Sequence, residues 1–398
     1  MSNTLQLDKT SWKPVTFGDV VAEVRTNTKD PVADGIKRVV GLEHIEPECI
    51  HLRNWASIDE DTTFTKVFHK GHVLFGRRRA YLKKAALADF DGICSGDITV
   101  MEAKEDLLPE LLPFLVNNDK FFDYAVQHSA GGLSPRTKFK DIANYEFLLP
   151  PKEQQAKLAE LLWAADETIE QKTQIVDQIA LTKEALIDHH VKEITRSGKV
   201  LTIAELATDE KNACCGGPFG SDLTAKDYVL EPGVPVIRGT NLTKGKARFV
   251  EDDFVYVSED KGLSLEKNSA RRGDILVTQR GTLGQIGLIP KDSKFPQYIV
   301  SQSQMKVTIN EDLALSEYVY YYLLSRRAQR HLEIVTISTG VPHINLGIFK
   351  NFPIPVPSLD TQVQVTSGLS QIDSTIGTAV DNVIQSKSLL KTLINQIF

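Results

Sequence analysis

The chain contains one internal repeat, and this repeat constrains its architecture more than any other feature of the sequence. Residues 13–20 (KPVTFGDV) resemble residues 199–206 (KVLTIAEL), 186 positions later. At the other end of each copy, residues 144–150 (NYEFLLP) match residues 351–357 (NFPIPVP) at an offset of 207, which then holds without a gap to the last residue. The rising offset places insertions in the globular part of the second copy. We therefore expect two versions of one folding unit.

Two anchors inside the repeat keep the same order. Residues 40–45 (VGLEHI) align with 237–242 (IRGTNL) at an offset of 197, and residues 71–74 (GHVL) align with 273–276 (GDIL) at an offset of 202. Short β-rich runs and one helix are expected in each copy, so both copies are predicted to be α/β domains. We expect strands at 73–76, 92–101, 274–279 and 298–309, helices around 111–128 and 316–334, a glycine-rich connection at 216–222 and a tight strand connection at 281–287.

A long helical segment closes each copy. The segments 151–197 and 358–398 contain no proline beyond their first residues, and their hydrophobic residues alternate three and four positions apart, as in a coiled coil. About 40 residues at 1.5 Å each make a rod of roughly 60 Å, which is a spacer. The nine positions that we assign to the hydrophobic seams of the two helices are Leu158, Leu162, Ile169, Val176, Leu369, Ile372, Ile376, Val383 and Leu390.

The two seams share one register, since subtracting 207 from the residue numbers of the second seam gives those of the first. Lys172, Lys183 and His190 then interrupt the first seam, and polar seam residues can set pairing or register. An isolated amphipathic helix usually packs on its own globular domain, and that alternative stays open. The shared register favours antiparallel pairing of the two helices, which would close the chain into a ring with pseudo-twofold symmetry.

Composition excludes several classes of protein. A length of 398 residues suits two or three domains, and a net charge of -6, from 46 basic and 52 acidic residues, excludes a uniformly basic DNA-coating protein. Any surface for nucleic acid must be local. The four cysteines lack the spacing of a zinc site or a disulfide framework, and we find neither a secretory leader nor an apolar run of membrane-spanning length. We therefore expect a reduced, cytoplasmic protein.

No catalytic or metal-binding motif stands out. The pairs His69/His72 and His189/His190 lack the spacing of a metal site, and residues 281–287 lack the lysine and serine that end a phosphate-binding loop. The tetrapeptide at 351–354 only partly matches the Asn-Pro-Pro-Tyr motif of amino-methyltransferases. We therefore expect no catalytic residue, no metal and no cofactor in this chain.

Positive charge is concentrated in one stretch of this acidic chain. Residues 77–84 hold five cations and a tyrosine, a composition that attracts phosphates and can also read guanine. The alternative is a strand edge that its cations protect from aggregation. The candidate DNA-binding residues in this stretch are Arg77, Arg78, Arg79, Tyr81 and Lys83.

Further candidates follow the same strand in the second copy and occupy a second loop in each copy. Hydroxyl, amide and guanidinium groups reach phosphates or base edges, although ordinary helix-to-strand turns would explain these loops as well. The residues are Ser134, Arg136, Lys138, Arg238, Thr278, Gln279, Arg280, Gln285, His343 and Asn345.

Over nearly its whole length the chain resembles the specificity subunits of type I restriction-modification systems. The matching segments are GHVLFGRRR (71–79), CSGD (94–97), GDILVTQRG (273–281), SQSQ (301–304), LLPPKEQQ (148–155) and IPVPSLDTQ (354–362). The two domain endings are the most specific of these. One departure is Thr361, which stands where the first ending has Gln154.

The resemblance implies a role in DNA recognition and phage defence. Two target-recognition domains, at 1–150 and 198–357, would each read a few base pairs of double-stranded DNA, and the helices would fix the gap between two unlike half-sites. Two modification subunits that carry S-adenosylmethionine would methylate adenine N6. A restriction subunit using ATP and Mg²⁺, if present, would cleave unmethylated DNA. The chain itself would not be catalytic.

Two other classes of protein remain. A self-contained methyltransferase or nuclease would bind S-adenosylmethionine or cleave DNA as an isolated chain. A scaffold that uses the helices only as a spacer would be indifferent to DNA, whereas a specificity subunit would bind DNA with an affinity that falls steeply with salt.

Overall fold

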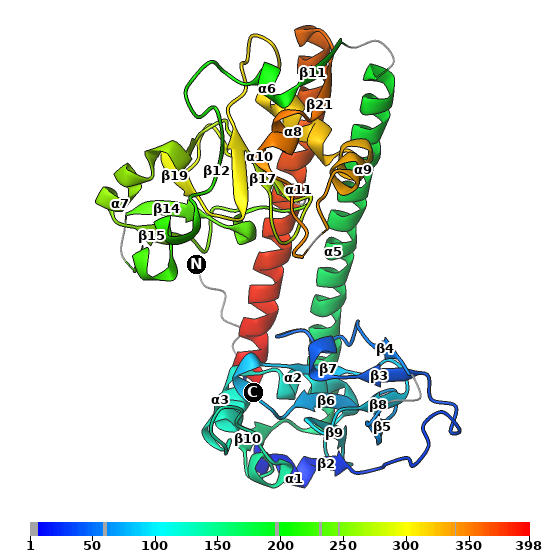
Figure 1. Ribbon diagram of the computed structural model, residues 1–398. Coiled ribbons are helices and arrows are strands. Elements are labelled where there is room, and N and C mark those ends of the chain that lie inside the picture. Colours follow the sequence, from blue (N-terminus) through cyan, green and yellow to red (C-terminus); the bar gives the residue numbers. More distant parts are fainter. Residues whose placement is uncertain (1–6, 59–61, 196–198, 231–232, 246, 339) are drawn as a thin grey trace. The chain divides into compact units, whose positions relative to one another are not determined.

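The computed structural model describes residues 7–58, 62–195, 199–230, 233–245, 247–338 and 340–398 (Figure 1). The chain divides into two compact units, one made of Met1–Gln171 with Val383–Phe398 and the other of Lys172–Asn382. Each unit thus contains one copy of the repeat and a part of both long helices. The expected domain boundary between residues 197 and 198 lies outside the described residues.

The first unit holds two four-stranded sheets and a short antiparallel ribbon. One sheet is antiparallel throughout, and in the other β3 and β8 run parallel. The first sheet has the order β2 (Val21–Val24), β9 (Ile98–Ala103), β6 (Val73–Gly76), β7 (Ala85–Leu87); the second has β4 (Ala56–Ser57), β3 (Arg38–Val40), β8 (Gly92–Cys94), β5 (Lys66–Phe68); and β1 (Lys13–Thr16) pairs with β10 (Glu146–Leu149).

The second unit repeats this plan. Its parallel pair is β14 with β19, at the place of β3 and β8. One sheet has the order β12 (Cys214–Gly216), β20 (Gln304–Val307), β17 (Ile275–Thr278), β18 (Ile286–Leu288); the other has β13 (Tyr228–Val229), β15 (Val255–Val257), β14 (Val234–Ile237), β19 (Gln297–Val300), β16 (Ser269–Arg271); and β11 (Lys199–Thr202) pairs with β21 (Pro353–Val356). The structure confirms the predicted α/β class and the repeat.

The prediction of a single strand at 92–101 and at 298–309 is wrong. Each run contains two strands that belong to different sheets, β8 and β9 in the first unit and β19 and β20 in the second. The residues between them form turns, in which Ile98 N donates to Ser95 O and Gln304 N to Ser301 O, both at 3.0 Å. The chain therefore crosses from one sheet to the other at a short polar segment, 95–97 (SGD) in the first unit and 301–303 (SQS) in the second.

Each expected domain helix is also divided in two. Asn118 and Ser325 cap the second halves, because their side chains accept hydrogen bonds from Phe121 N and Ala328 N. The helices are α2 (Leu112–Val116), α3 (Asp119–Gln127), α8 (Ser316–Leu324) and α9 (Arg326–Ile334); the shorter helices are α1 (Phe17–Val20), α4 (Phe139–Ile142), α6 (Ile203–Leu206), α7 (Glu259–Ser264) and α10 (Leu346–Lys350).

The long helices have the expected extents. Helix α5 spans Lys152–Ile194 and α11 spans Leu359–Ile397. Of the predicted seam residues, Val176 and Ile372 are half-buried. The remaining seven are buried: Leu158, Leu162, Ile169, Leu369, Ile376, Val383 and Leu390.

Near the end of α5 the buried face departs from the expected seam. Ile187 and Val191 are buried, whereas His190, which was expected in the seam, is only half-buried. A straight helix repeats every 3.6 residues and drifts away from a 3.5-residue seam, which shifts the buried face by one position.

Within the second unit the two long helices run antiparallel. Ile187 and Val191 of α5 share one hydrophobic core with Val365 and Leu369 of α11. Lys183 Nζ lies 2.6 Å from Asp373 Oδ1, so the numbering falls along α11 as it rises along α5. The same core contains residues of α8 and β17, so the helices pack on the globular domain as well as on each other. The structure confirms the predicted antiparallel pairing.

Candidate nucleic-acid interface

In each unit the structure places one predicted loop against the other. The turn after β6 pairs with the loop after α3 through a bridge between Arg78 and Arg136, and the turn after β17 pairs with the loop after α9 through a bridge between Arg280 and His343. These pairs are repeat equivalents, because 280 is 78 plus 202 and 343 is 136 plus 207. We call each turn with its neighbouring loop a turn pair.

The first turn pair is organised around a carboxylate. Asp97 Oδ1 accepts a hydrogen bond from Arg136 Nε at 2.6 Å, and Arg78 Nη1 lies 3.4 Å from Asp97 Oδ2. The hydrogen bond from Arg136, followed by the charges of Arg136 and Arg78, lowers the pKa of Asp97. Arg78 also donates to Ser134 Oγ at 3.2 Å. Asp97 therefore holds two guanidinium groups side by side.

Three candidates of the first unit face solvent beside this carboxylate. Arg79 and Lys138 are exposed, and Tyr81 is 54% exposed. Arg79 has a φ of +55°, and its backbone N–H donates to Pro135 O. The backbone of the turn is therefore bonded to the neighbouring loop at Arg79. The exposed cations and the tyrosine form a surface suited to phosphates and bases.

Lys83 is held by an ion pair within the first unit. Its Nζ lies 2.7 Å from Asp119 Oδ1, and Lys391 Nζ of α11 lies 2.9 Å from the same oxygen. Burial tends to raise the pKa of Asp119, but hydrogen bonds from Lys83, Lys391 and Asn395 outweigh it and lower the pKa to about 2. Lys83 thus joins the turn to α3 and α11.

Arg77 is also only partly available. It is half-buried, and its Nε is buried without a hydrogen-bond partner among the described residues. Its backbone links the turn to both neighbours, since Arg77 N donates to Asp97 O and Arg77 O accepts from Thr137 N, each at 2.9 Å. Arg77 therefore shapes the turn pair.

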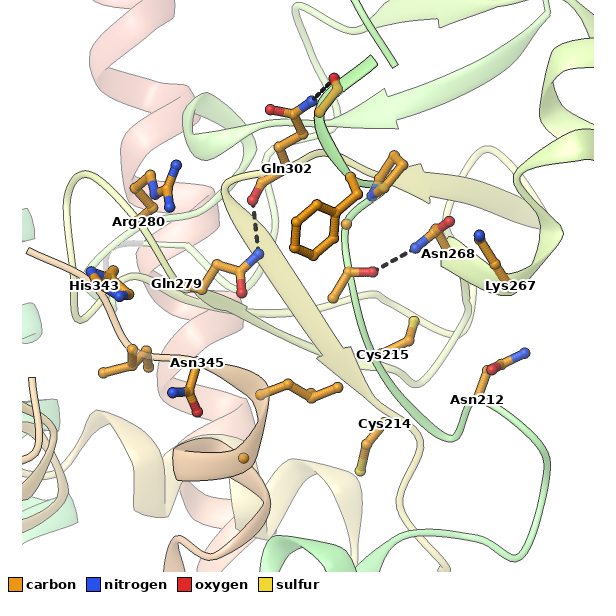
Figure 2. A pocket seen from close by; sticks show the side chains of 18 residues that line it. Asn212, Cys214, Cys215, Lys267, Asn268, Gln279, Arg280, Gln302, His343 and Asn345 are labelled. Atoms are coloured by element: carbon orange, nitrogen blue, oxygen red, sulfur yellow. Dashed lines mark hydrogen bonds between the residues drawn. The ribbon is translucent and has the colours of Figure 1, made fainter. Parts of the chain in front are cut away.

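The second turn pair borders a cavity of about 710 Å³ (Figure 2). Gln279 and Arg280 line it from the turn after β17, Gln302 from the turn before β20, and His343 and Asn345 from the loop before α10. Residues 216–220 and the pair Lys267 and Asn268 also contribute to the lining. Amide, imidazole and guanidinium groups thus converge on one hollow.

The polar groups of this cavity are held in place by backbone contacts. Gln279 Nε2 donates to Gln302 O at 2.7 Å (Figure 2). Asn345 Oδ1 accepts from Ile348 N at 2.8 Å and caps α10. His343 Nδ1 lies 3.1 Å from Val341 O. Arg280 is exposed and lines the cavity, so its charge is accessible to a ligand there.

Three further candidates of the second unit form hydrogen bonds within the domain. Thr278 is buried and donates to Gln285 Oε1 at 3.1 Å, while Gln285 Nε2 donates to Leu242 O at 3.0 Å. Arg238 bonds to Asp253, with Nη2 2.6 Å from its carbonyl oxygen and 3.1 Å from Oδ2. These side chains link the strands behind the turn.

Sequence reasoning missed several lining residues. Phe219, Lys267 and Gln302 border the cavity. The sequence predicts only a connection at 216–222 and only a family motif at Gln302. The available signal for Phe219 was its position among glycines and a proline, because a loop of this composition has few apolar neighbours to cover an aromatic ring.

The part of the chain that the structure describes holds no group of three or more His, Cys, Asp or Glu side chains arranged to bind a metal ion. Among the same residues, no helix combines the length and apolar character needed to cross a membrane.

Comparison with known proteins assigns the family. Residues 9–181 and 223–386 match the family described as Type I restriction modification DNA specificity domain. The match includes most of both copies of the repeat. The chain therefore belongs to this family, which confirms the resemblance in the sequence.

Two curated relatives are specificity subunits. The EcoDI specificity subunit of Escherichia coli is 28% identical over 167 residues, which cover 41% of this chain and 37% of that protein. The MjaVIII specificity subunit of Methanocaldococcus jannaschii is 23% identical over 304 residues, 72% of this chain and 68% of that protein. The chain thus matches just over a third of the first relative and about two thirds of the second.

Solved structures share the fold. The type I restriction-modification S subunit from M. genitalium aligns over 99% of this chain and 98% of its own length, with a TM-score of 0.52 and 14% identity. A chain from a structure concerned with assembly and conformational transition of the type I R-M system aligns over 98% of this chain and 97% of its own, with a TM-score of 0.51 and 18% identity.

Proposed function

We propose that this chain is the DNA-reading subunit of a type I restriction-modification complex and that each unit reads one half of a two-part target. The observation that carries the proposal is the repeated turn pair. Arg78 and Arg136 in the first unit, and Arg280 and His343 in the second, occupy equivalent places next to equivalent strands. Two related surfaces in one chain suit a target with two parts.

The two turn pairs differ in chemistry, so the half-sites would differ. The first presents guanidinium groups held by Asp97, and the second presents amides and an imidazole around a cavity. Guanidinium groups pair well with guanine O6 and N7, while asparagine and glutamine side chains pair well with adenine. The target would therefore be asymmetric.

Catalysis would belong to partner subunits. We assign to this chain no catalytic residue, and to two modification subunits the S-adenosylmethionine and the methylation of adenine N6. A restriction subunit, where present, would supply ATP, Mg²⁺ and cleavage. The complex would act in the cytoplasm, where its DNA is. The long helices would space the half-sites, since a rod of roughly 60 Å exceeds one DNA turn of about 34 Å.

The outer faces of the long helices offer places for partners to dock. Ile175 and Leu181 of α5 are 55% and 59% exposed, and Ile384 and Leu389 of α11 are 58% and 59% exposed. Apolar side chains on a helix that are not covered by the same chain suit contact with another protein. We assign these faces to the modification subunits.

The test is DNA binding by the full chain, assembled with its modification subunits, as a function of salt. We expect the affinity to fall steeply with salt and Arg280→Ala to weaken binding, since a lost phosphate contact lowers the salt slope by about 1 and a lost base contact costs about 1–3 kcal/mol. Lys157→Ala on α5 is the control, because it also removes one exposed cation, but from a helix outside the turn pairs. Binding of the wild-type complex that is independent of both salt and sequence would overturn the proposal.

A further inference from the structure

An aromatic side chain stands in solvent at the rim of the second unit's cavity. Phe219 lines this cavity and is 90% exposed. Burying a phenylalanine side chain stabilises a protein by about 1.5–3 kcal/mol, and this ring forgoes almost all of that. A single exposed apolar residue is common on protein surfaces, so exposure alone does not identify a role. The loop that carries Phe219 supplies further evidence.

This loop is fixed on both sides of Phe219. Gly217 N donates to Gln304 O at 3.0 Å, and Asn268 Nδ2 donates to Gly216 O at 2.7 Å (Figure 2). Beyond the ring, Gln302 Nε2 donates to Gly220 O at 2.6 Å. The aromatic ring is therefore presented from an anchored backbone, which lowers the entropy cost of using it in binding.

The glycine before the ring is required by a close approach. A Cβ on Gly217 would lie 2.0 Å from Ser301 O, a backbone atom. The loop is thus pressed against the turn that also carries Gln302. Side chains larger than hydrogen would push the loop outward and away from the cavity. The sequence Gly-Gly-Pro-Phe-Gly holds the ring at this rim.

The surroundings of Phe219 select the class of ligand. Gln279, Arg280, Gln302 and Lys267 line the same cavity. A membrane surface or an apolar protein partner would be opposed by these groups, whereas a nucleic acid offers phosphates to the cations, base edges to the amides and a flat base for the ring.

The first unit supplies an exposed aromatic ring from a different place. Tyr81, 54% exposed, lies in the turn after β6 itself. Its repeat equivalent, at 81 plus 202, is Leu283, which is half-buried. In the second unit the turn therefore lacks the ring, and the loop at 216–220 brings Phe219 to the same turn pair.

We propose that Phe219 stacks on a base of the bound DNA and opens one base-pair step in the second half-site, as an apolar wedge. This inference rests on the proposed function, since it requires that the second unit binds DNA. Apolar wedges inserted at a base step unstack it and kink the duplex, and the kink lets more of the protein surface contact the DNA. Phe219 would thereby favour half-sites that contain an easily unstacked step.

The test uses the full chain assembled with its modification subunits and a duplex that carries the motif found by methylation mapping. 2-Aminopurine replaces single adenines across the second half-site, except the adenine that is methylated, because a methyltransferase turns its target base out of the stack. The fluorescence of 2-aminopurine rises when its stacking is lost. We expect a rise at one step with wild type. Phe219→Ala should abolish the rise and weaken affinity for the motif about 10-fold, the loss of one base-stacking contact. Phe219→Trp should keep both.

The control is Leu263→Ala, since Leu263 is 71% exposed in the same unit and is not part of the cavity lining. It should leave fluorescence and affinity unchanged. Two results would overturn the wedge while leaving the proposed function intact. One is a fluorescence rise that persists in Phe219→Ala. The other is wild-type binding to the motif without a rise at any position where 2-aminopurine was placed. Wild type that does not prefer the motif over unrelated DNA would overturn the proposed function and the wedge with it.

Discussion

Asp166 of α5 and Asp373 of α11 occupy the same place in the repeat, 207 residues apart, and join their helices to different partners. Asp373 lies 2.6 Å from Lys183 Nζ, 2.8 Å from Arg248 Nε and 2.6 Å from the hydroxyl of Tyr321. Asp166 lies 2.8 Å from His51 Nε2. Both contacts connect a long helix to the globular domain that precedes it.

The partners themselves are repeat equivalents. His51 and Arg248 are 197 residues apart, the offset that also relates residues 40–45 to 237–242. Arginine keeps its charge at every physiological pH, whereas histidine is charged only when protonated. The two halves thus make one contact in two ways, with a permanent charge in the second unit and a titratable charge in the first.

The second contact is also the larger network. Lys183 is 1% exposed and reaches Asp373 from the other helix, while the residue equivalent to it, 207 positions later, is the apolar Leu390. The comparison teaches that a repeat can keep a carboxylate and change everything that binds it. Breaking the two contacts should therefore have unequal effects.

The largest effect is expected from Asp373→Asn. The substitution leaves the buried Lys183 ammonium and the Arg248 guanidinium without their carboxylate, which costs about 3–5 kcal/mol for a buried pair. Thermal unfolding together with hydrogen exchange in α8 and α11 measures the loss. The matched control is Asp381→Asn on the exposed face of α11, which should change stability little. An equal effect of the two substitutions would contradict the network.

A smaller effect is expected from Asp166→Asn. Asp166 is 6% exposed but binds one half-exposed histidine, and a hydrogen bond to a charged group contributes about 1.5–3 kcal/mol. The amide oxygen can still accept a hydrogen bond from the imidazole, which reduces the loss. Hydrogen exchange around residues 42–52 reports it, with the exposed Glu160→Gln as the control. A loss as large as that of Asp373→Asn would remove the contrast between the units.

The pH dependence should separate the units further. The hydrogen bond to Asp166, opposed by burial, raises the pKa of His51 above its usual 6.5. A histidine with a raised folded-state pKa stabilises most below pH 6.5 and loses that contribution as pH rises through the raised pKa. With the partial exposure of His51, we expect less than about 1 kcal/mol.

The measurement is the thermal stability of the first unit from pH 6 to pH 8, roughly the range in which histidine titrates. His51→Gln should remove the part of the slope that belongs to this contact. His51→Arg, which imitates Arg248, should make that part constant with pH. Identical slopes in wild type and His51→Gln would show that the pair does not contribute.

The smallest effect is expected from Glu170→Gln. Glu170 accepts a hydrogen bond from Arg53 and its charge also helps to raise the pKa of His51, after the larger effect of Asp166. Removing the charge should lower the pKa of His51 slightly and cost less than about 1 kcal/mol. An NMR titration of the His51 imidazole measures this, with the exposed Glu167→Gln as the control. An unchanged pKa would limit the contact to His51 and Asp166.

Much of the fold could be predicted from periodicity. The two helices extend over almost the expected residues because a sustained helical period without internal proline is visible in the sequence. The turns at 95–97 and 301–303 were not predicted, although their sequences, SGD and SQS, are polar and typical of turns. Asn118 and Ser325 did signal helix starts, but long apolar patterns on both sides concealed the breaks.

The site was predictable as loops and less so as side chains. Sequence order places Arg136 and Arg280 on the two turn pairs, but it does not show which carboxylates bind Arg136 and Lys83. Asp97 lies 39 residues from Arg136, and Asp119 lies 36 from Lys83, distances at which only the folded chain shows contact. Lys83, Thr278 and Gln285 are predicted DNA-binding residues from their side-chain chemistry alone. The sequence does not show whether such a polar side chain contacts DNA or its own domain.

The most direct test of the central claim is single-molecule methylation mapping of the host genome with and without this gene. The account predicts that N6-methyladenine disappears at one asymmetric two-part motif when the gene is removed, while methylation at other motifs persists. An unchanged map, with the genes for the modification subunits shown to be expressed, would contradict the assignment of DNA recognition to this chain.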